Sequence, residues 1–239
     1  MQLPLAQLTA DPCLFPDPNS ALKSPDGLLA IGGDLTPKRL LYAYYQGIFP
    51  WFNEGDPLLW WSPSVRAIFE PNSLTLDRSL KKYLKKYPFT FSCNQSFLDV
   101  MHLCAQTREE TGGTWIQPNI MAAYTIMHQL DLAHSIEVWL EGELVGGCYG
   151  LQIGQLFCGE SMFNLMPNTA KLALVMLQQH LSTYTQGLID CQMPNPFLLQ
   201  MGAKPLPRAE YLNLLHANRS HPTPETMWQA RALQLKVDV

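Results

Sequence analysis

The segment from residue 134 to residue 192 constrains the fold more than any other part of the chain. It opens with three closely spaced apolar runs of strand length, at residues 134–140, 144–151 and 155–162. Glu141-Gly142 and Gly154 separate these runs and are typical of tight hairpin turns. An antiparallel meander is therefore expected here.

A strand–helix–strand unit follows. Asn168 is the expected N-cap of a long helix that reaches about Tyr184, and Gly187 leads into a strand at residues 188–192. Because crossover connections of this kind are right-handed, the strands at 155–162 and 188–192 should be parallel. The sequence thus predicts a chain that combines helices and strands, an α/β (α+β) fold, with a mixed central sheet.

Three polar side chains fall near the carboxyl ends of these two strands, namely Glu160, Asp190 and Gln192. Open α/β sheets bind ligands at that edge, and strand alternation would place Asp190 and Gln192 on one face. No basic residue lies between Lys171 and Lys204, so we expect the two carboxylates to bind a cationic group from outside. The alternative is that both acids are solvated strand ends.

Proline use divides the chain into an irregular front and a regular middle. Ten of the nineteen prolines fall within residues 1–71. That region contains one clear helix, which begins after the expected N-cap Thr36 and ends before Gly47. The other elements expected before the meander are strands at 66–70 and 89–92 and helices at 78–87, 96–106 and 119–130.

Tryptophans are dense just after that first helix. Trp51, Trp60 and Trp61 lie within eleven residues of one another. Large aromatic side chains dominate both cores and interfaces, so this cluster is either core packing or a domain junction that also forms a ligand wall.

The charge distribution is uneven. A net charge of −4 and a pI near 5.8 argue against a nucleic-acid partner for the chain as a whole. One helix nevertheless carries five cations in a single stripe: Arg78, Lys81, Lys82, Lys85 and Lys86. The stripe is either a solvated face or a contact for several phosphates, to which Arg39 and Arg66 could add.

Signals for other chemistry are weak. The histidines lack metal-ligand spacing and no cysteine cluster completes a zinc site, so we expect no metal. The glycines of residues 146–159 fit neither of the phosphate-loop patterns G-x-G-x-x-G and G-x-x-x-x-G-K-[ST]. Cys158 and Cys191 lie in apolar strands and are interpreted as buried, with a thiol nucleophile as the alternative. Dispersed cysteines, and no apolar run near the ~18 residues of a membrane span, favour a cytoplasmic location without membrane contact.

Several blocks of the sequence together resemble the leucyl/phenylalanyl-tRNA–protein transferase family over about residues 14–216. These blocks are GLLAIGGDL (27–35), GIFPWF (47–52), LWWSP (59–63), GTWI (113–116), HSIEVW (134–139), LVGG (144–147), FCGESMF (157–163) and LIDCQ (188–192). The resemblance implies an aminoacyltransferase that moves Leu or Phe, and also Met, from aminoacyl-tRNA to the N-terminal Arg or Lys of a protein. Such a transfer marks the acceptor for degradation by the N-degron pathway.

The resemblance also implies an architecture. We expect a small N-terminal domain at residues 1–62 and an acetyltransferase-like (GNAT) catalytic domain at residues 63–239. Aminoacyl-tRNA would be a co-substrate, with no further cofactor, and nothing in the sequence demands more than a monomer.

By similarity, the catalytic positions are Glu160, Asp190 and Gln192. Our hypothesis is that Asp190 orients Gln192, whose side-chain oxygen directs the attacking amine, and that Glu160 helps to hold the cationic acceptor. The implied pocket for the donor side chain is lined by Trp51, Trp115, Cys148, Phe157, Met162, Leu174, Leu177 and Ile189. The implied tRNA-binding positions are Arg78, Lys82, Lys85 and Lys86.

The sequence also departs from the family. Asn164-Leu165 stands where the family commonly has Ser-Arg, which removes a cation near the site. Two rival functions remain: an acetyl-CoA-dependent N-acetyltransferase, although residues 162–172 lack its pyrophosphate loop, and a non-catalytic tRNA-binding module.

Overall fold

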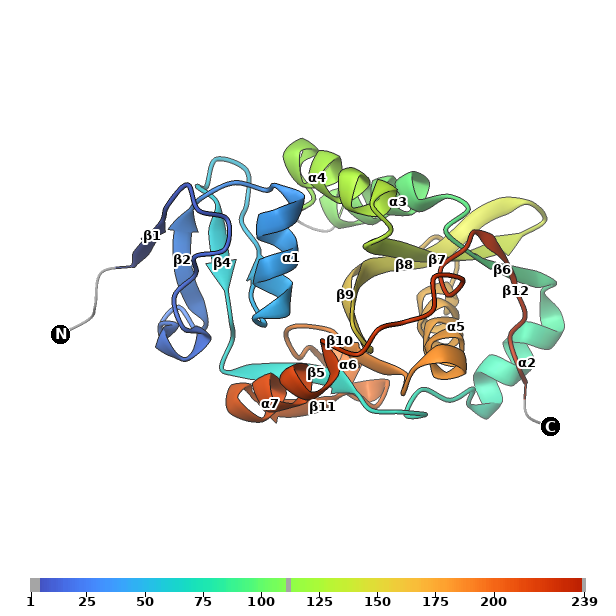
Figure 1. Ribbon diagram of the computed structural model, residues 1–239. Helices are drawn as coiled ribbons and strands as arrows, with labels where there is room; N and C mark the ends of the chain where they lie inside the picture. Colours follow the sequence, from blue (N-terminus) through green and yellow to red (C-terminus); the bar gives the residue numbers. More distant parts are fainter. Residues whose placement is uncertain (1–4, 111–112, 238–239) are drawn as a thin grey trace.

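The computed structural model describes residues 5–110 and 113–237 (Figure 1). The front of the chain forms a small sheet of order β1-β2-β4-β3. Its strands are β1 (Ala6–Leu8), β2 (Leu28–Gly32), β3 (Phe49–Pro50) and β4 (Leu59–Trp61). Helix α1 (Pro37–Tyr45) lies between this sheet and the rest of the protein (Figure 1).

The rest of the described chain forms an eight-stranded mixed sheet of order β11-β5-β10-β9-β8-β7-β6-β12. Its strands are β5 (Val65–Phe69), β6 (Phe89–Cys93), β7 (Ala133–Leu140), β8 (Glu143–Ile153), β9 (Leu156–Asn164), β10 (Leu188–Asp190), β11 (Lys204–Pro207) and β12 (Arg231–Leu233). The strands β9 and β10 are parallel, and their neighbours in the sheet are antiparallel.

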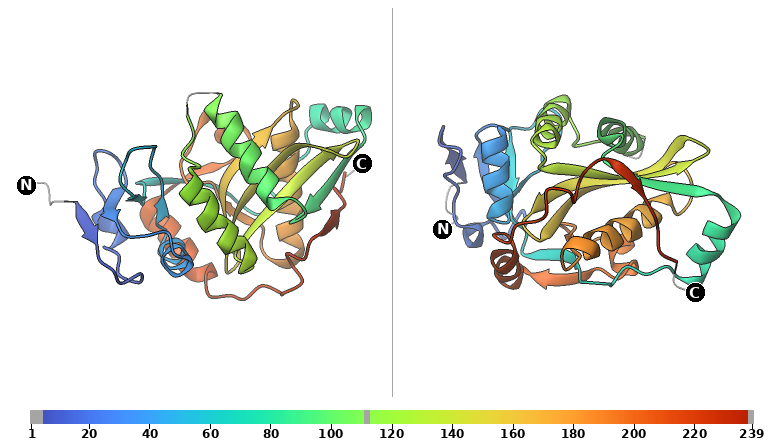
Figure 2. Two further views of the ribbon diagram at one scale, coloured as in Figure 1. Left: turned by 90° about the horizontal axis from the view of Figure 1, so that it is seen from above. Right: turned by 45° about the vertical axis from the view of Figure 1, so that its right-hand side comes forward.

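Helices cover both faces of this sheet. On one face lie α3 (Phe97–Glu109) and α4 (Pro118–Gln129), and on the other lies α5 (Thr169–Tyr184), as Figures 1 and 2 show. Successive side chains of each strand point to opposite faces of the sheet and so belong to two separate hydrophobic clusters. Cys158 packs on the side of α3 and α4, and Phe157 packs on the side of α5. The shorter helices are η1 (Pro18–Ser20), α2 (Arg78–Lys86), α6 (Pro196–Gln200) and α7 (Arg208–Asn218).

The predicted fold class, the meander and the parallel crossover pair are confirmed. Glu141 and Gly142 both have positive φ, at 52° and 88°, as a tight turn between β7 and β8 requires. None of the α helices in the described chain is long and apolar enough to cross a membrane.

The expected N-cap positions of two helices, Thr36 and Asn168, are confirmed, but neither side chain forms a capping hydrogen bond. Asn168 adopts φ 69° and makes no side-chain capping bond to α5, and Thr36 makes none to α1. The Thr36 hydroxyl instead donates to Asp34 Oδ1 at 2.6 Å. The strand predicted at 188–192 is also too long, because β10 ends at Asp190.

Candidate active site

The parallel strands β9 and β10 part at their carboxyl ends. They pair from Leu188 opposite Leu156 to Asp190 opposite Cys158, and the register stops there. A cavity of about 370 Å³ lies beyond this point. Such a split gives a ligand access to the interior edge of a sheet, which is the usual position of sites in open α/β folds.

A β-bulge directs Glu160 towards this cavity. Gly150 pairs with Gly159, but the next pair joins Tyr149 to Ser161, which leaves Glu160 as the extra residue of β9. Bulges of this kind re-aim a side chain and are frequent next to active sites. The Glu160 side chain is buried and lines the cavity.

Two tyrosines and one amide surround the Glu160 carboxyl. Tyr44 from α1 lies 2.6 Å from Oε1, Tyr124 from α4 lies 3.1 Å from Oε2, and Gln192 Nε2 donates to Oε1 at 2.7 Å. Burial, and then the nearby Glu160, raise the pKa of both tyrosines, so their hydroxyls stay protonated.

Burial raises the pKa of Glu160 to about 7, against the hydrogen bonds from Tyr44 and Tyr124 that lower it. The Tyr44 and Tyr124 hydroxyls also contact each other, so the carboxyl and both hydroxyls form one buried cluster.

Asp190 lies behind the cavity in a buried ion pair. Arg66 from β5 contacts both Asp190 oxygens, and the Tyr211 hydroxyl donates to Oδ2 at 2.9 Å. Burial opposes the charge on Arg66, but the Asp190 carboxylate outweighs it and raises the pKa of the guanidinium. The expectation that both acids lack an internal cation is therefore wrong, because the cation comes from β5 and not from the segment between Lys171 and Lys204.

The backbone of Gln192 adopts an unusual conformation. Its φ is 62°, a left-handed value that is uncommon for residues other than glycine. The Gln192 N–H donates to Asp190 Oδ1 at 2.8 Å, and its carbonyl accepts the N–H of Ala67 at 3.0 Å. The expected sharing of one strand face by Asp190 and Gln192 is wrong, since the strand ends between them. Asp190 fixes Gln192 through the main chain instead.

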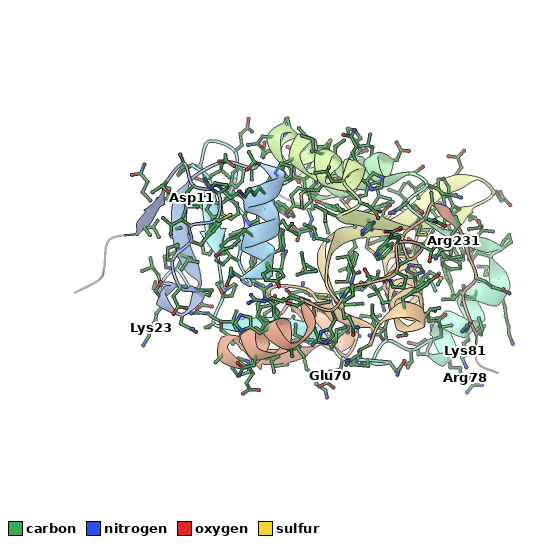
Figure 3. All side chains as sticks on the ribbon, in the orientation of Figure 1. Asp11, Lys23, Glu70, Arg78, Lys81 and Arg231 are labelled. Atoms are coloured by element: carbon green, nitrogen blue, oxygen red, sulfur yellow. The ribbon has the colours of Figure 1, made fainter. Side chains whose placement is uncertain are left out.

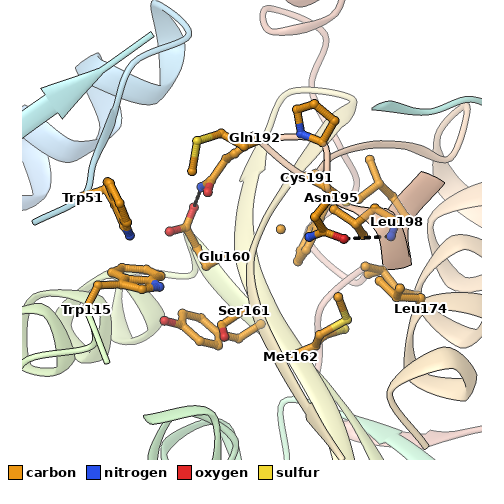
Figure 4. Close-up of a pocket in the computed structure, with 18 of the residues that line it drawn as sticks. Trp51, Trp115, Glu160, Ser161, Met162, Leu174, Cys191, Gln192, Asn195 and Leu198 are labelled. Carbon is orange, nitrogen blue, oxygen red and sulfur yellow. Dashed lines mark hydrogen bonds between the residues drawn. The ribbon is translucent and has the colours of Figure 1, made fainter. Parts of the chain in front are cut away.

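While its main chain is bound to Asp190 and Ala67, the Gln192 side chain reaches Glu160 (Figure 4). Its Nε2 faces Glu160, and no donor from the described residues contacts its Oε1. Because an amide presents its two polar atoms in opposite roles, the oxygen is available to accept a hydrogen bond from a substrate.

The cavity brings together Glu160, Gln192 and every residue predicted for the donor pocket. Those eight are Trp51, Trp115, Cys148, Phe157, Met162, Leu174, Leu177 and Ile189. The tryptophans stand on one side and Leu174 with Leu198 on the other, with Gln192 and Glu160 between them (Figure 4). Of the predicted catalytic trio, only Asp190 does not line the cavity.

Several residues at the site were not predicted from the sequence. Arg66 and the three tyrosines that hydrogen-bond to the carboxyls lie on four different elements, and no local pattern links them. The tyrosines are Tyr44, Tyr124 and Tyr211. The cavity is also lined by Arg108, Tyr149, Gly159, Ser161, Cys191, Met193, Pro194, Asn195 and Leu198.

The predicted cationic stripe lies on α2, at the end of the molecule opposite the small sheet (Figures 1 and 3). Its four predicted tRNA contacts, Arg78, Lys82, Lys85 and Lys86, are all exposed. Arg39 and Arg66 cannot add to this surface, because both are fully or almost fully buried. Their suggested role in contacting phosphates is wrong.

The described residues also bear on metal and thiol chemistry. No group of three or more His, Cys, Asp or Glu side chains that could hold a metal occurs within residues 5–110 and 113–237. Burial is the main cause that raises the pKa of the Cys158 and Cys191 thiols, so thiolates are disfavoured.

The fold and the site define a mixed α/β protein whose apolar cavity meets a buried carboxyl and a half-buried amide. Residues 68–216 match the family described as Leucyl/phenylalanyl-tRNA protein transferase, and residues 33–64 match that family's N-terminal domain. The chain belongs to this family. The resemblance found in the sequence blocks is confirmed.

Relatives match almost the whole chain. A leucyl/phenylalanyl-tRNA–protein transferase of Shewanella loihica is 51% identical over 98% of this chain and 99% of its own length. The enzyme of the same description from Shewanella sp. (strain ANA-3) is 53% identical over 90% of this chain and 91% of its own. A solved protein of unknown function from Bacteroides thetaiotaomicron overlaps 57% of this chain and 53% of its own at 12% identity, but its TM-score of 0.39 carries no argument.

The raised pKa of Glu160 predicts a pH-dependent stability. An acid with a pKa of about 4.5 unfolded and about 7 folded is protonated in both states below pH 4.5. Stability is then lost as the pH rises from about 4.5 to about 7, by about 3 kcal/mol in total. Glu160→Gln should remove this dependence. Urea unfolding of both proteins between pH 5 and pH 8 measures it.

The matched control is Glu143→Gln, which changes an exposed glutamate on β8 in the same way. The stability difference between this control and the native chain should stay constant with pH. If Glu160→Gln behaves like the control, Glu160 is ionised in the folded protein throughout this range.

Proposed function

We propose that this chain transfers Leu or Phe, and also Met, from aminoacyl-tRNA to the N-terminal Arg or Lys of acceptor proteins. The new peptide bond would mark the acceptor for N-degron degradation. The observation that carries the proposal is the apolar cavity directly beside the Glu160–Gln192 pair. The relatives are leucyl/phenylalanyl-tRNA–protein transferases, a name that contains the same donor residues, leucine and phenylalanine.

The proposed reaction needs positioning more than covalent catalysis. An aminoacyl ester is already activated, so the acceptor amine has only to be held against its carbonyl carbon. The amine nitrogen attacks that carbon, the bond to the ribose oxygen breaks, and the amine proton ends on the leaving oxygen. Gln192 Oε1 accepts an N–H of the attacking amine and so directs its lone pair towards the carbonyl.

Asp190 and Glu160 have different duties in this scheme. Asp190 is a positioning residue, because it acts through the main chain of Gln192 and lies outside the cavity. Glu160 lines the cavity and, when ionised, offers a carboxylate that helps to hold the cationic acceptor. The nearness of its pKa to neutrality lets both forms be populated.

The eight predicted donor-pocket residues would receive the aminoacyl side chain. An apolar wall selects by shape, and each methylene changes the free energy of binding by only about 1–3 kcal/mol. Unbranched or γ-branched side chains should fill the space between Met162 and Leu174 better than β-branched Val or Ile.

Further parts of the proposal concern architecture and context. We assign residues 1–62 to a small N-terminal domain and residues 63–239 to an acetyltransferase-like catalytic domain. The division between the two sheets, which falls between Trp61 and Val65, supports this boundary. The enzyme would work as a cytoplasmic monomer without a cofactor.

A transfer assay tests the function. The chain is incubated with charged Phe-tRNA or with acetyl-CoA, and with a peptide that begins with Arg. Phenylalanine should appear on the peptide only with the charged tRNA. Acetylation would favour an N-acetyltransferase, and tRNA binding without any transfer would favour a non-catalytic binding module.

The same assay tests the role of Gln192. Gln192→Ala should lower kcat at least ~100-fold, since it removes the group that directs the amine. Gln186→Ala is the matched control, because it truncates an exposed glutamine. Near-normal kcat in Gln192→Ala would refute the assignment.

The exposed cations of α2 should bind the tRNA. Lys82→Glu with Lys85→Glu should raise KM for Phe-tRNA and reduce the slope of log KM against log salt by roughly 2, because about one counterion is released per phosphate contact. The same two charge reversals at Lys23 and Lys38 serve as the control. Equal effects of both pairs would show only a general dependence on net charge.

A further inference from the structure

Arg108 is a cation within the cavity that the reaction scheme above does not use. It lies near the end of α3, is half buried, and is the only Lys or Arg among the described residues that line the cavity. Its Nε donates to the Ser161 hydroxyl at 2.9 Å. Ser161 follows Glu160 directly, so the guanidinium is fixed to the strand that carries the carboxyl.

The position of Ser161 sets the side of the cavity to which Arg108 belongs. Ser161 lies on the side of Trp51 and Trp115, across from Leu174 and Leu198 (Figure 4). The aliphatic side suits the aminoacyl side chain. Trp51 and Trp115 close the donor pocket on its other side, so the nucleotide end of an ester whose carbonyl faces Gln192 would leave the pocket along these tryptophans.

The nearest anion to the reacting ester in an aminoacyl-tRNA is the phosphate on the 5′ oxygen of the same terminal nucleotide. Arginine is suited to a phosphate because its planar guanidinium can donate two parallel hydrogen bonds.

We propose that Arg108 binds the phosphate 5′ to the terminal nucleotide of the donor and thereby positions the ester against Gln192. This inference rests on the proposed function, and it adds a positioning residue to that site. It requires no change in the bonds made and broken.

Two small donors test the inference: the 3′-phenylalanyl ester of adenosine 5′-monophosphate and the same ester of adenosine. With an acceptor peptide that begins with Arg, the native chain should use the phosphorylated donor with a kcat/KM about 10- to 100-fold higher, as expected for charge-assisted hydrogen bonds. Arg108→Gln should lose that preference by slowing only the phosphorylated donor. Arg108→Lys should keep part of it.

The ratio of the two donors is measured on one preparation, so partial loss of folded protein does not affect it. Lys38→Gln, which removes an exposed cation on α1, is the matched control and should keep the full ratio. The inference is overturned if the native chain does not distinguish the two donors, or if Arg108→Gln slows both equally. If the native chain transfers from neither donor nor from Phe-tRNA, it is the proposed function that fails.

Discussion

Where β5 meets β10, two opposite charges are held away from water. A buried ion costs several kcal/mol in lost hydration, and the pair is tolerated only when its remaining hydrogen-bonding groups are satisfied. Here Asp190 also accepts hydrogen bonds from the Tyr211 hydroxyl and the Gln192 N–H, and Arg66 donates one to the Gly47 carbonyl at 3.3 Å. Removing one partner of such a pair costs about 3–5 kcal/mol.

The ion pair joins the two sheets and sets the geometry of the cavity. Arg66 lies over the ring of Phe49 on β3 at 5.0 Å, so a residue of the large sheet packs against the small one. Tyr44 on α1 makes a second connection through Glu160. The front of the chain therefore supplies part of the site, and the left-handed backbone of Gln192 is kept in place by groups from both β5 and β10.

Periodicity and turn chemistry were sufficient to predict the meander, α5 and the parallel strands, because each is a local pattern. Glu160 and Gln192 could be placed at one edge for the same reason. The residues that hydrogen-bond to these carboxyls could not be predicted from local patterns. Tyr44 and Glu160, for example, are 116 residues apart and meet only through tertiary packing. The short strands β11 and β12 are edge strands of four and three residues whose pairing depends on neighbours already in place.

The central claim is that the cavity beside Glu160 and Gln192 holds the donor. A crystal structure with a non-hydrolysable phenylalanyl-adenosine amide tests it most directly. The phenyl ring should lie among Met162, Leu174 and Ile189, with the carbonyl carbon within reach of an amine held by Gln192 Oε1. Electron density for the ligand elsewhere, with this cavity empty, would show that the donor does not bind beside Glu160 and Gln192.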